Sequence, residues 1–114
     1  MRGFLKATKA LSDKTRVRIF KMLQQKEMCV CEVRAVLGIA QSTASKHLNI
    51  LEDAGLVSRT KEGLWVNYEI DQHSHNPHAE PIIKYLSSIL DDDPDVKADA
   101  KKALKANRFE LCSK

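Results

Sequence analysis

Hydrophobic residues recur at helical spacing along the first half of the chain and predict four helices. Phe4, Ala7, Thr8 and Leu11 form the stripe of the first, and Ser12 or Asp13 can cap the second. The predicted helices cover residues 4–11, 13–25, 31–37 and 41–54. The last two are separated by a short turn, residues 38–40, and this order predicts a helix-turn-helix.

Residues 56–70 change to the period of a half-buried strand. Leu64, Val66, Tyr68 and Ile70 alternate with Trp65 and polar residues. Residues 57–61 supply the partner strand, and residues 62–63 supply the turn of the hairpin. Helices followed by a two-stranded hairpin predict a mainly α fold with a small β-hairpin, the winged helix-turn-helix.

A further helix is predicted from about Ala79 to Leu90, with Pro81 suited to its first turn. It is apolar over more than one face, which indicates a dimer surface. Asp91-Asp92-Asp93-Pro94 then breaks the chain. We expect a DNA-binding and dimerisation domain at 1–92, and a charged tail at 93–114 that carries Cys112 and is either a frayed helix or disordered.

The charge distribution fits a nucleic-acid partner and equally fits ordinary solvated charge. The net charge is +4, with 12 Lys or Arg against 7 Asp or Glu in residues 1–70 (+5) and 7 against 8 in residues 71–114 (−1). The basic excess therefore coincides with the helix-turn-helix, as a phosphate-binding surface requires. No segment is long and apolar enough to cross a bilayer or act as a signal, so we expect a soluble, cytoplasmic protein.

A base-reading helix needs short polar side chains in its N-terminal half. Residues 41–47 meet this requirement, and two basic residues of the hairpin can reach flanking phosphates or the minor groove. The predicted DNA-binding residues are Gln41, Ser42, Thr43, Ser45, Lys46, His47, Arg59 and Lys61. The alternative is a solvated polar face on a helical core, or a surface for protein contacts.

The chain contains three cysteines, of which Cys29 and Cys31 are one residue apart. In a reducing compartment this favours metal binding or redox chemistry over a disulfide framework. Residues two apart inside a helix point about 200° away from each other, so the pair can converge on one ion only at a helix start. We therefore place Cys29 outside the helix and Cys31 in its first turn, where the helix dipole lowers a thiol pKa. The alternative is a buried Cys29 with an incidental Cys31.

Four segments together resemble the ArsR/SmtB family of small metal-responsive repressors, with order and spacing intact from about residue 4 to residue 90. They are ALSDKTRVRIFKML at 10–23, MCVCEV at 28–33, QSTASKHLNILEDAGLV at 41–57 and KEGLWVNY at 61–68. The resemblance implies a homodimer built on the first and last helices, bound to a dyad-symmetric operator in double-stranded DNA. It also implies that the metal-free form represses and the metal-bound form releases the DNA.

The effector implied is a soft ion bound by Cys29 and Cys31. The arsenic-sensing branch has a third cysteine three residues after the second, where this chain has Arg34, and the cadmium- and lead-sensing branch adds cysteines from an N-terminal arm that has none here. Cys112 is the one remaining candidate ligand. With three thiols at most, As(III) or Sb(III) is favoured, and Cd or Pb is the alternative.

Two other classes of protein could use these thiols. A redox or persulfide sensor would oxidise the same cysteines. An enzyme is disfavoured, because the chain lacks a C-x-x-C motif and a base placed to partner a thiol. We expect no resident cofactor.

Overall fold

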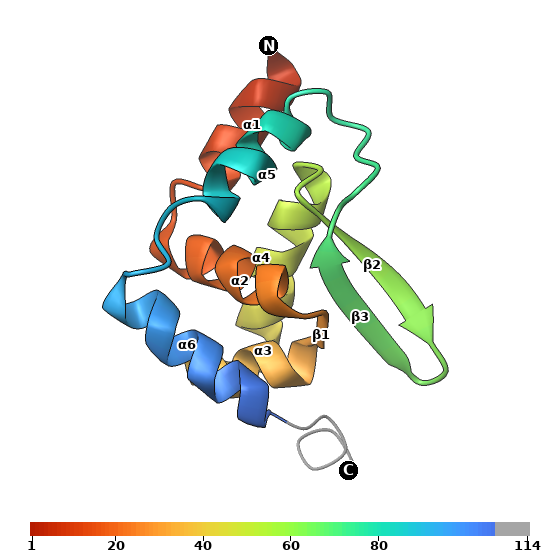
Figure 1. Ribbon diagram of the computed structural model, residues 1–114. Coiled ribbons are helices and arrows are strands. Elements are labelled where there is room, and N and C mark those ends of the chain that lie inside the picture. The colour runs from red at the N-terminus through yellow and green to blue at the C-terminus, as the bar shows by residue number, and fades with distance from the viewer. Residues whose placement is uncertain (107–114) are drawn as a thin grey trace.

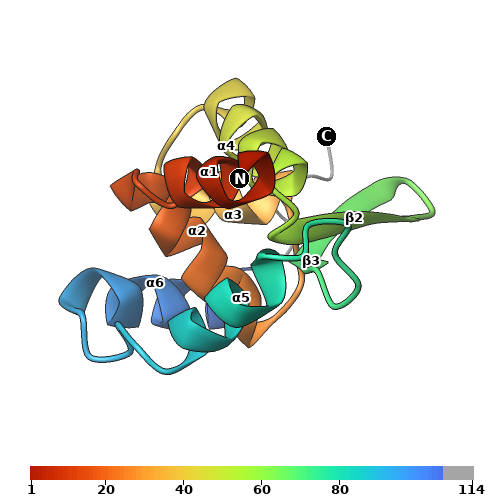
Figure 2. The same ribbon diagram turned by 90° about the horizontal axis from the view of Figure 1, so that it is seen from above.

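The computed structural model of the protein describes residues 1–106 as six helices and a three-stranded antiparallel sheet (Figure 1). The elements are α1 (Arg2–Ala10), α2 (Lys14–Gln25), β1 (Met28–Cys29), α3 (Val30–Leu37), α4 (Gln41–Asp53), β2 (Val57–Glu62), β3 (Trp65–Ile70), α5 (Ala79–Ser87) and α6 (Pro94–Lys105). The hairpin of β2 and β3 projects to one side of the helices in both views (Figures 1 and 2). This arrangement confirms the predicted winged helix-turn-helix.

The four N-terminal helices begin and end close to the predicted residues. Capping residues that can be recognised in the sequence mark some of these ends. The side chain of Asp13 accepts a hydrogen bond of 3.0 Å from the backbone N–H of Arg16 and so caps α2. The C-cap of α3 is Gly38. The core is mainly aliphatic around two aromatic rings, Phe20 and Tyr68. Its fully buried members include Ile19, Phe20, Val33, Leu48, Leu51 and Leu56.

The sheet differs from the predicted hairpin in two respects. Its strands lie in the order β1-β3-β2, and the two-residue strand β1, which was not predicted, pairs Met28 with Tyr68 and Cys29 with Asn67. β3 is thus a central strand, and Asn67 is buried although the alternation placed it outside. Leu64 is also not part of the strand, because it lies in the turn and is 96% exposed.

α5 is anchored to α2 by one buried lysine. The ammonium group of Lys21 donates to the carbonyl oxygens of Leu86 at 2.7 Å and Ile89 at 2.8 Å, and it lies 3.1 Å from a carboxylate oxygen of Asp91. Leu86 is in the last turn of α5 and Ile89 follows the helix, so neither carbonyl has the regular partner of the helix interior, although the backbone N–H of Ile89 lies 3.5 Å from the Leu86 oxygen. The lysine therefore satisfies the end of α5 and fixes it to the core. The helix ends at Ser87, earlier than the predicted Leu90.

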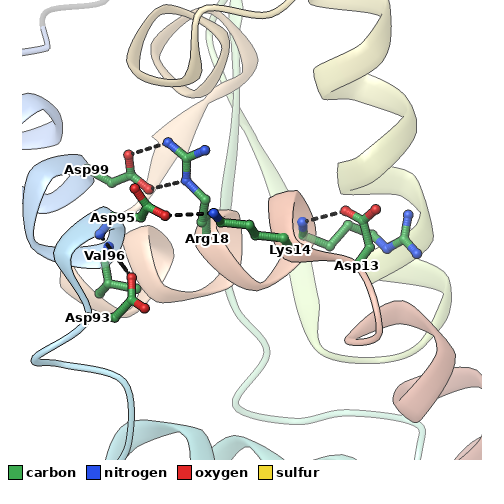
Figure 3. Close-up of polar contacts among 8 residues, drawn as sticks. Asp13, Lys14, Arg18, Asp93, Asp95, Val96 and Asp99 are labelled. Carbon is green, nitrogen blue, oxygen red and sulfur yellow. Dashed lines mark hydrogen bonds and ion pairs between the residues drawn. The ribbon is translucent and has the colours of Figure 1, made fainter.

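The chain beyond residue 93 continues as α6, which packs against α2 and α3. Figure 3 shows the polar contacts that hold it to α2. Arg18 donates two hydrogen bonds of 2.8 Å to Asp99, which is 1% exposed, while Lys14 forms an exposed ion pair of 2.8 Å with Asp95. The predicted tail is therefore helical up to Lys105. The boundary between residues 92 and 93 stays a prediction of domain organisation.

Candidate DNA-reading surface and thiol pair

The packing of α4 decides which of its side chains can reach DNA. Ala44, Leu48 and Leu51 are fully buried against the rest of the core. The remaining sides of the helix carry the six predicted DNA-binding side chains of α4. Of these, Gln41, Ser42, Thr43 and Lys46 are exposed, and Ser45 and His47 are half-buried. The surface thus has the polar, short-side-chain character of a helix that enters the major groove.

The hairpin carries the two remaining predicted DNA-binding residues, Arg59 and Lys61, on β2. Both are exposed, and because they are two residues apart on a strand they share one face. A carboxylate oxygen of Glu52, on α4, lies 3.2 Å from Nε of Arg59. This ion pair joins the wing to the reading helix, while Lys61 extends toward the tip of the hairpin.

One residue near this surface was not selected from the sequence. From the sequence alone, Arg16 would be expected to lie along the apolar stripe of α2 with its charged head in water. In the structure it is half-buried and its guanidinium contacts the ring of His47, with 3.3 Å between Nη1 and Nδ1. A charged residue inside an apolar stripe was the available signal, but its partner is 31 positions away in the chain.

The thiol pair straddles the start of α3 as predicted. Cys29 is the N-cap with an extended backbone, φ −87° and ψ 167°, and Cys31 follows in the first turn. Cys29 is 3% exposed, whereas Cys31 is half-buried. The backbone N–H of Cys29 donates to Oε1 of Glu32 at 3.0 Å, which closes a capping box and fixes this end of the helix.

The predicted lowering of the thiol pKa is wrong for Cys29. Burial raises the pKa of its thiol, because the low-dielectric surroundings disfavour the thiolate, and a backbone hydrogen bond at Glu32 opposes this only in part. The positive end of a short helix is thus outweighed by desolvation. Cys29 is held as a neutral thiol that must lose its proton when it binds an ion.

The described residues do not supply a third ligand beside Cys29 and Cys31. Cys112 lies outside the described residues, and Arg34 occupies the next turn of α3 after Cys31. Within residues 1–106 no three His, Cys, Asp or Glu side chains are grouped so that they could hold a metal ion. Cys31 is disulfide-bonded in the structure, so it must be reduced before it can bind an ion.

Cys31 also lies beside the reading helix. Its Sγ atom is 3.9 Å from Oε1 of Gln41, the first residue of α4. α3 and α4 pack directly on one another. The candidate ion-binding residue and the first candidate base-reading residue are therefore in contact, which the sequence predicted only at the level of neighbouring helices.

The fold, the polar face of α4 and the basic wing define a winged helix-turn-helix DNA-binding protein. The model of the family described as "Bacterial regulatory protein, arsR family" matches residues 13–59. With the relatives below, this shows that the chain belongs to the arsR family, whose members are DNA-binding transcription regulators and not enzymes. No helix within residues 1–106 has the length and apolar character needed to span a bilayer.

Two curated relatives and one solved structure illustrate the similarity. The chain is 43% identical over 67 residues to a "Cadmium resistance transcriptional regulatory protein CadC homolog" from Staphylococcus aureus, a match that covers 58% of this chain and 55% of the relative. It is 32% identical over 77 residues to the "Arsenical resistance operon repressor" of Bacillus subtilis, covering 67% and 73% respectively. A homodimeric winged helix-turn-helix DNA-binding domain from Mycobacterium bovis superposes with a TM-score of 0.62 at 28% identity, covering 75% of this chain and 71% of that one. The chain thus spans little more than half the length of the cadmium-related protein.

Proposed function

We propose that the chain is a metalloid-responsive transcriptional repressor that acts in the cytoplasm. Its metal-free dimer binds operator DNA, and it releases the DNA when As(III) or Sb(III) binds the thiolates of Cys29 and Cys31. Cys112 is the proposed third ligand. The name of the Bacillus subtilis relative supports an arsenical effector, and the name of the Staphylococcus aureus relative keeps Cd(II) or Pb(II) as the alternative within the same fold.

The observation that carries this proposal is the distance of 3.9 Å between Sγ of Cys31 and Oε1 of Gln41. In the reduced protein this is the geometry of a weak hydrogen bond, in which the thiol of Cys31 donates to the amide oxygen of Gln41, and a thiolate has no proton to donate. When an ion draws the Cys31 thiolate toward Cys29, the side chain of Gln41 loses this neighbour and must turn. Because Gln41 opens the reading helix, binding at the thiols changes the group offered to DNA.

The proposed dimer uses α1 and α5, which lie together at one end of the molecule (Figure 1). The ring of Phe4 meets that of His78 edge-on at a centroid distance of 5.9 Å, which places α1 beside the start of α5. Large apolar side chains remain exposed on both helices, with Phe4 at 44%, Leu5 at 54% and Tyr85 at 64%. A second copy would remove this apolar surface from water, and a two-fold axis would suit a dyad-symmetric operator.

The test is an arsenite titration of fully reduced protein bound to a fluorescent operator fragment, followed by anisotropy. We expect the wild type to dissociate, and Cys29→Ser and Cys31→Ser each to require at least about ten times more arsenite. Either serine variant dissociating like the wild type would overturn the thiol assignment. Cys112→Ser tests the third ligand by the number of sulfurs around arsenic in X-ray absorption, and a parallel Cd(II) titration ranks the two ions.

The coupling step is tested separately through Gln41. The ratio of DNA affinities without and with arsenite measures the coupling, which typically amounts to about 5- to 150-fold. We expect Gln41→Met to bring this ratio toward one while arsenite still binds, as seen by its thiolate absorption. Ser42→Ala is the matched control, because it alters the next exposed residue of α4 and should keep the ratio. A Gln41→Met protein with an unchanged ratio would contradict the mechanism.

Thiol redox sensing is the second candidate, because Cys31 is disulfide-bonded in the structure. Oxidation leaves the sulfur of Cys31 beside Gln41 but removes the proton that a reduced thiol could donate to Oε1. Mass spectrometry after peroxide and after arsenite distinguishes the two effectors. A loss of two protons without added mass, accompanied by DNA release, supports the redox sensor, whereas a retained arsenic adduct supports the metalloid sensor.

A further inference from the structure

The guanidinium of Arg16 joins three parts of the DNA-binding domain. It lies in the first turn of α2, where its Nε donates to the carbonyl oxygen of Ala10 at 2.7 Å and its Nη2 to that of Lys9 at 3.4 Å. Its Nη1 is 3.3 Å from Nδ1 of His47, on α4. Both carbonyls are at the C-terminal end of α1, and that of Lys9 also accepts from the backbone N–H and the hydroxyl of Ser12. The planar guanidinium of Arg16 thus binds the C-terminal end of α1 and contacts the reading helix α4 at the same time.

This contact determines which nitrogen of His47 carries a proton. A guanidinium stays protonated at any physiological pH and has donors only, so the ring nitrogen that faces it must accept. When Nδ1 of a neutral imidazole accepts, the ring proton is on Nε2. The nitrogen left over for DNA is then a hydrogen-bond donor. Without Arg16 the ring would be free to exchange its proton between both nitrogens and to rotate.

We propose that Arg16 is a positioning residue that holds His47 as the Nε2–H tautomer, so that DNA meets a donor at this point of the reading helix. The group recognised is a hydrogen-bond acceptor, either guanine N7 or O6, thymine O4, or a phosphate oxygen. The inference rests on the proposed contact of His47 with DNA, but the tautomer itself is independent of that contact. Arg16 also binds the C-terminal end of α1. It therefore fixes the position of the reading helix relative to one of the two helices proposed to form the dimer.

The tautomer is measured directly by long-range ¹H–¹⁵N correlation NMR on the reduced, DNA-free protein. We expect a single Nε2–H form for His47 in the wild type and a mixture of both tautomers in Arg16→Met. Lys14→Met is the matched control, since it removes a cation of the same helix whose partner is the exposed Asp95, and it should leave the His47 signals unchanged. A wild-type Nδ1–H form, or an unaltered ring in Arg16→Met, would overturn the proposal.

DNA binding supplies a second readout, in the form of a double-mutant cycle. Arg16→Met and His47→Ala are each expected to weaken operator binding on the order of 5- to 10-fold, and the double variant no more than His47→Ala alone. Multiplying effects would mean that Arg16 acts on DNA independently of His47 and would refute the positioning role. A normal tautomer result combined with no effect of His47→Ala on DNA would place the failure in the proposed DNA contact instead.

Loss of the contacts with the C-terminal end of α1 could unfold Arg16→Met, so Arg16→Lys accompanies it. A lysine keeps the charge and can still donate to Ala10, but it lacks the fork that also reaches His47. We expect its thermal stability to stay close to that of the wild type while the tautomer mixture appears. A folded Arg16→Lys protein with a purely Nε2–H ring would count against the proposal.

Discussion

The ion pair between Arg18 and Asp99 should contribute more to stability than any other polar contact of α6. Asp99 is 1% exposed and accepts both its hydrogen bonds, each 2.8 Å long, from one guanidinium (Figure 3). Hydrogen bonding to this carboxylate also raises the pKa of Arg18, which indicates that the charged pair is favoured in the folded state. Arg18→Met would leave the carboxylate buried without a partner.

The size of the loss follows from the burial. Removing one partner of a fully buried pair costs about 3–5 kcal/mol. The side chain of Arg18 is 27% exposed, so water can reach part of the site and we lower the expected loss to about 2–4 kcal/mol. The double variant Arg18→Met/Asp99→Leu removes the stranded charge and should recover at least about 2 kcal/mol of that loss.

The assay is urea unfolding at one fixed protein concentration, since dimerisation makes the transition depend on concentration. Far-UV circular dichroism reports the helices. Lys14→Met is the matched control, because it breaks the exposed pair with Asp95 in the same α2–α6 contact and should leave the midpoint nearly unchanged. If Arg18→Met unfolds at the same urea concentration as Lys14→Met, the reasoning from burial is refuted.

Three further predictions concern other parts of the molecule. Lys21→Met keeps the buried stem but removes the charged donor to the carbonyls of Leu86 and Ile89, so the free energy of unfolding should fall by about 2–3 kcal/mol. A loss smaller than about 1 kcal/mol would contradict the anchoring role. Gly55→Ala should cost at least about 2 kcal/mol, because φ is +77° and the new Cβ would clash with Oγ of Ser74. Gly63→Ala, with φ +61° and open space around it, should cost only about 1 kcal/mol, and equal thermal shifts for the two variants would contradict this. Burial raises the pKa of Cys29, so its thiol stays protonated in the folded state at pH values where the unfolded thiol ionises. The preference of the folded protein for the protonated thiol contributes to stability. That contribution is complete below the unfolded pKa and is lost as pH rises through the folded pKa. Alkylation of Cys29 in reduced protein should therefore be slower at pH 8 than in denaturant, and equal rates would refute the burial.

The elements of the fold could be predicted because their signals are local. Asp13 and Gly38 mark helix ends that the chain keeps whatever packs around it. β1 could not be predicted, since two residues carry no period and the strand exists only by pairing with β3. The alternation of β3 failed at Asn67 because its side chain is also covered, and its amide donates to Oε1 of Glu27 at 3.5 Å, a contact that spacing cannot reveal.

The candidate site was predictable by residue type but not by contact. Polar side chains on α4 and a cysteine pair at a helix start can be recognised from spacing alone. The 3.9 Å approach of Cys31 to Gln41 and the link from Arg16 to His47 depend on how helices pack. Asp99 has the sequence context of a solvated tail, and only its burial against Arg18 reveals a structural role.

The burial of Cys29 has a consequence for the speed of the proposed response. An ion can reach the half-buried Cys31 from solution, but it meets Cys29 only when the first turn of α3 opens. Capture by both thiols then proceeds no faster than this opening, so the rate of DNA release should level off as the ion concentration rises. A cell carrying such a repressor would respond after a fixed delay that the dose cannot shorten.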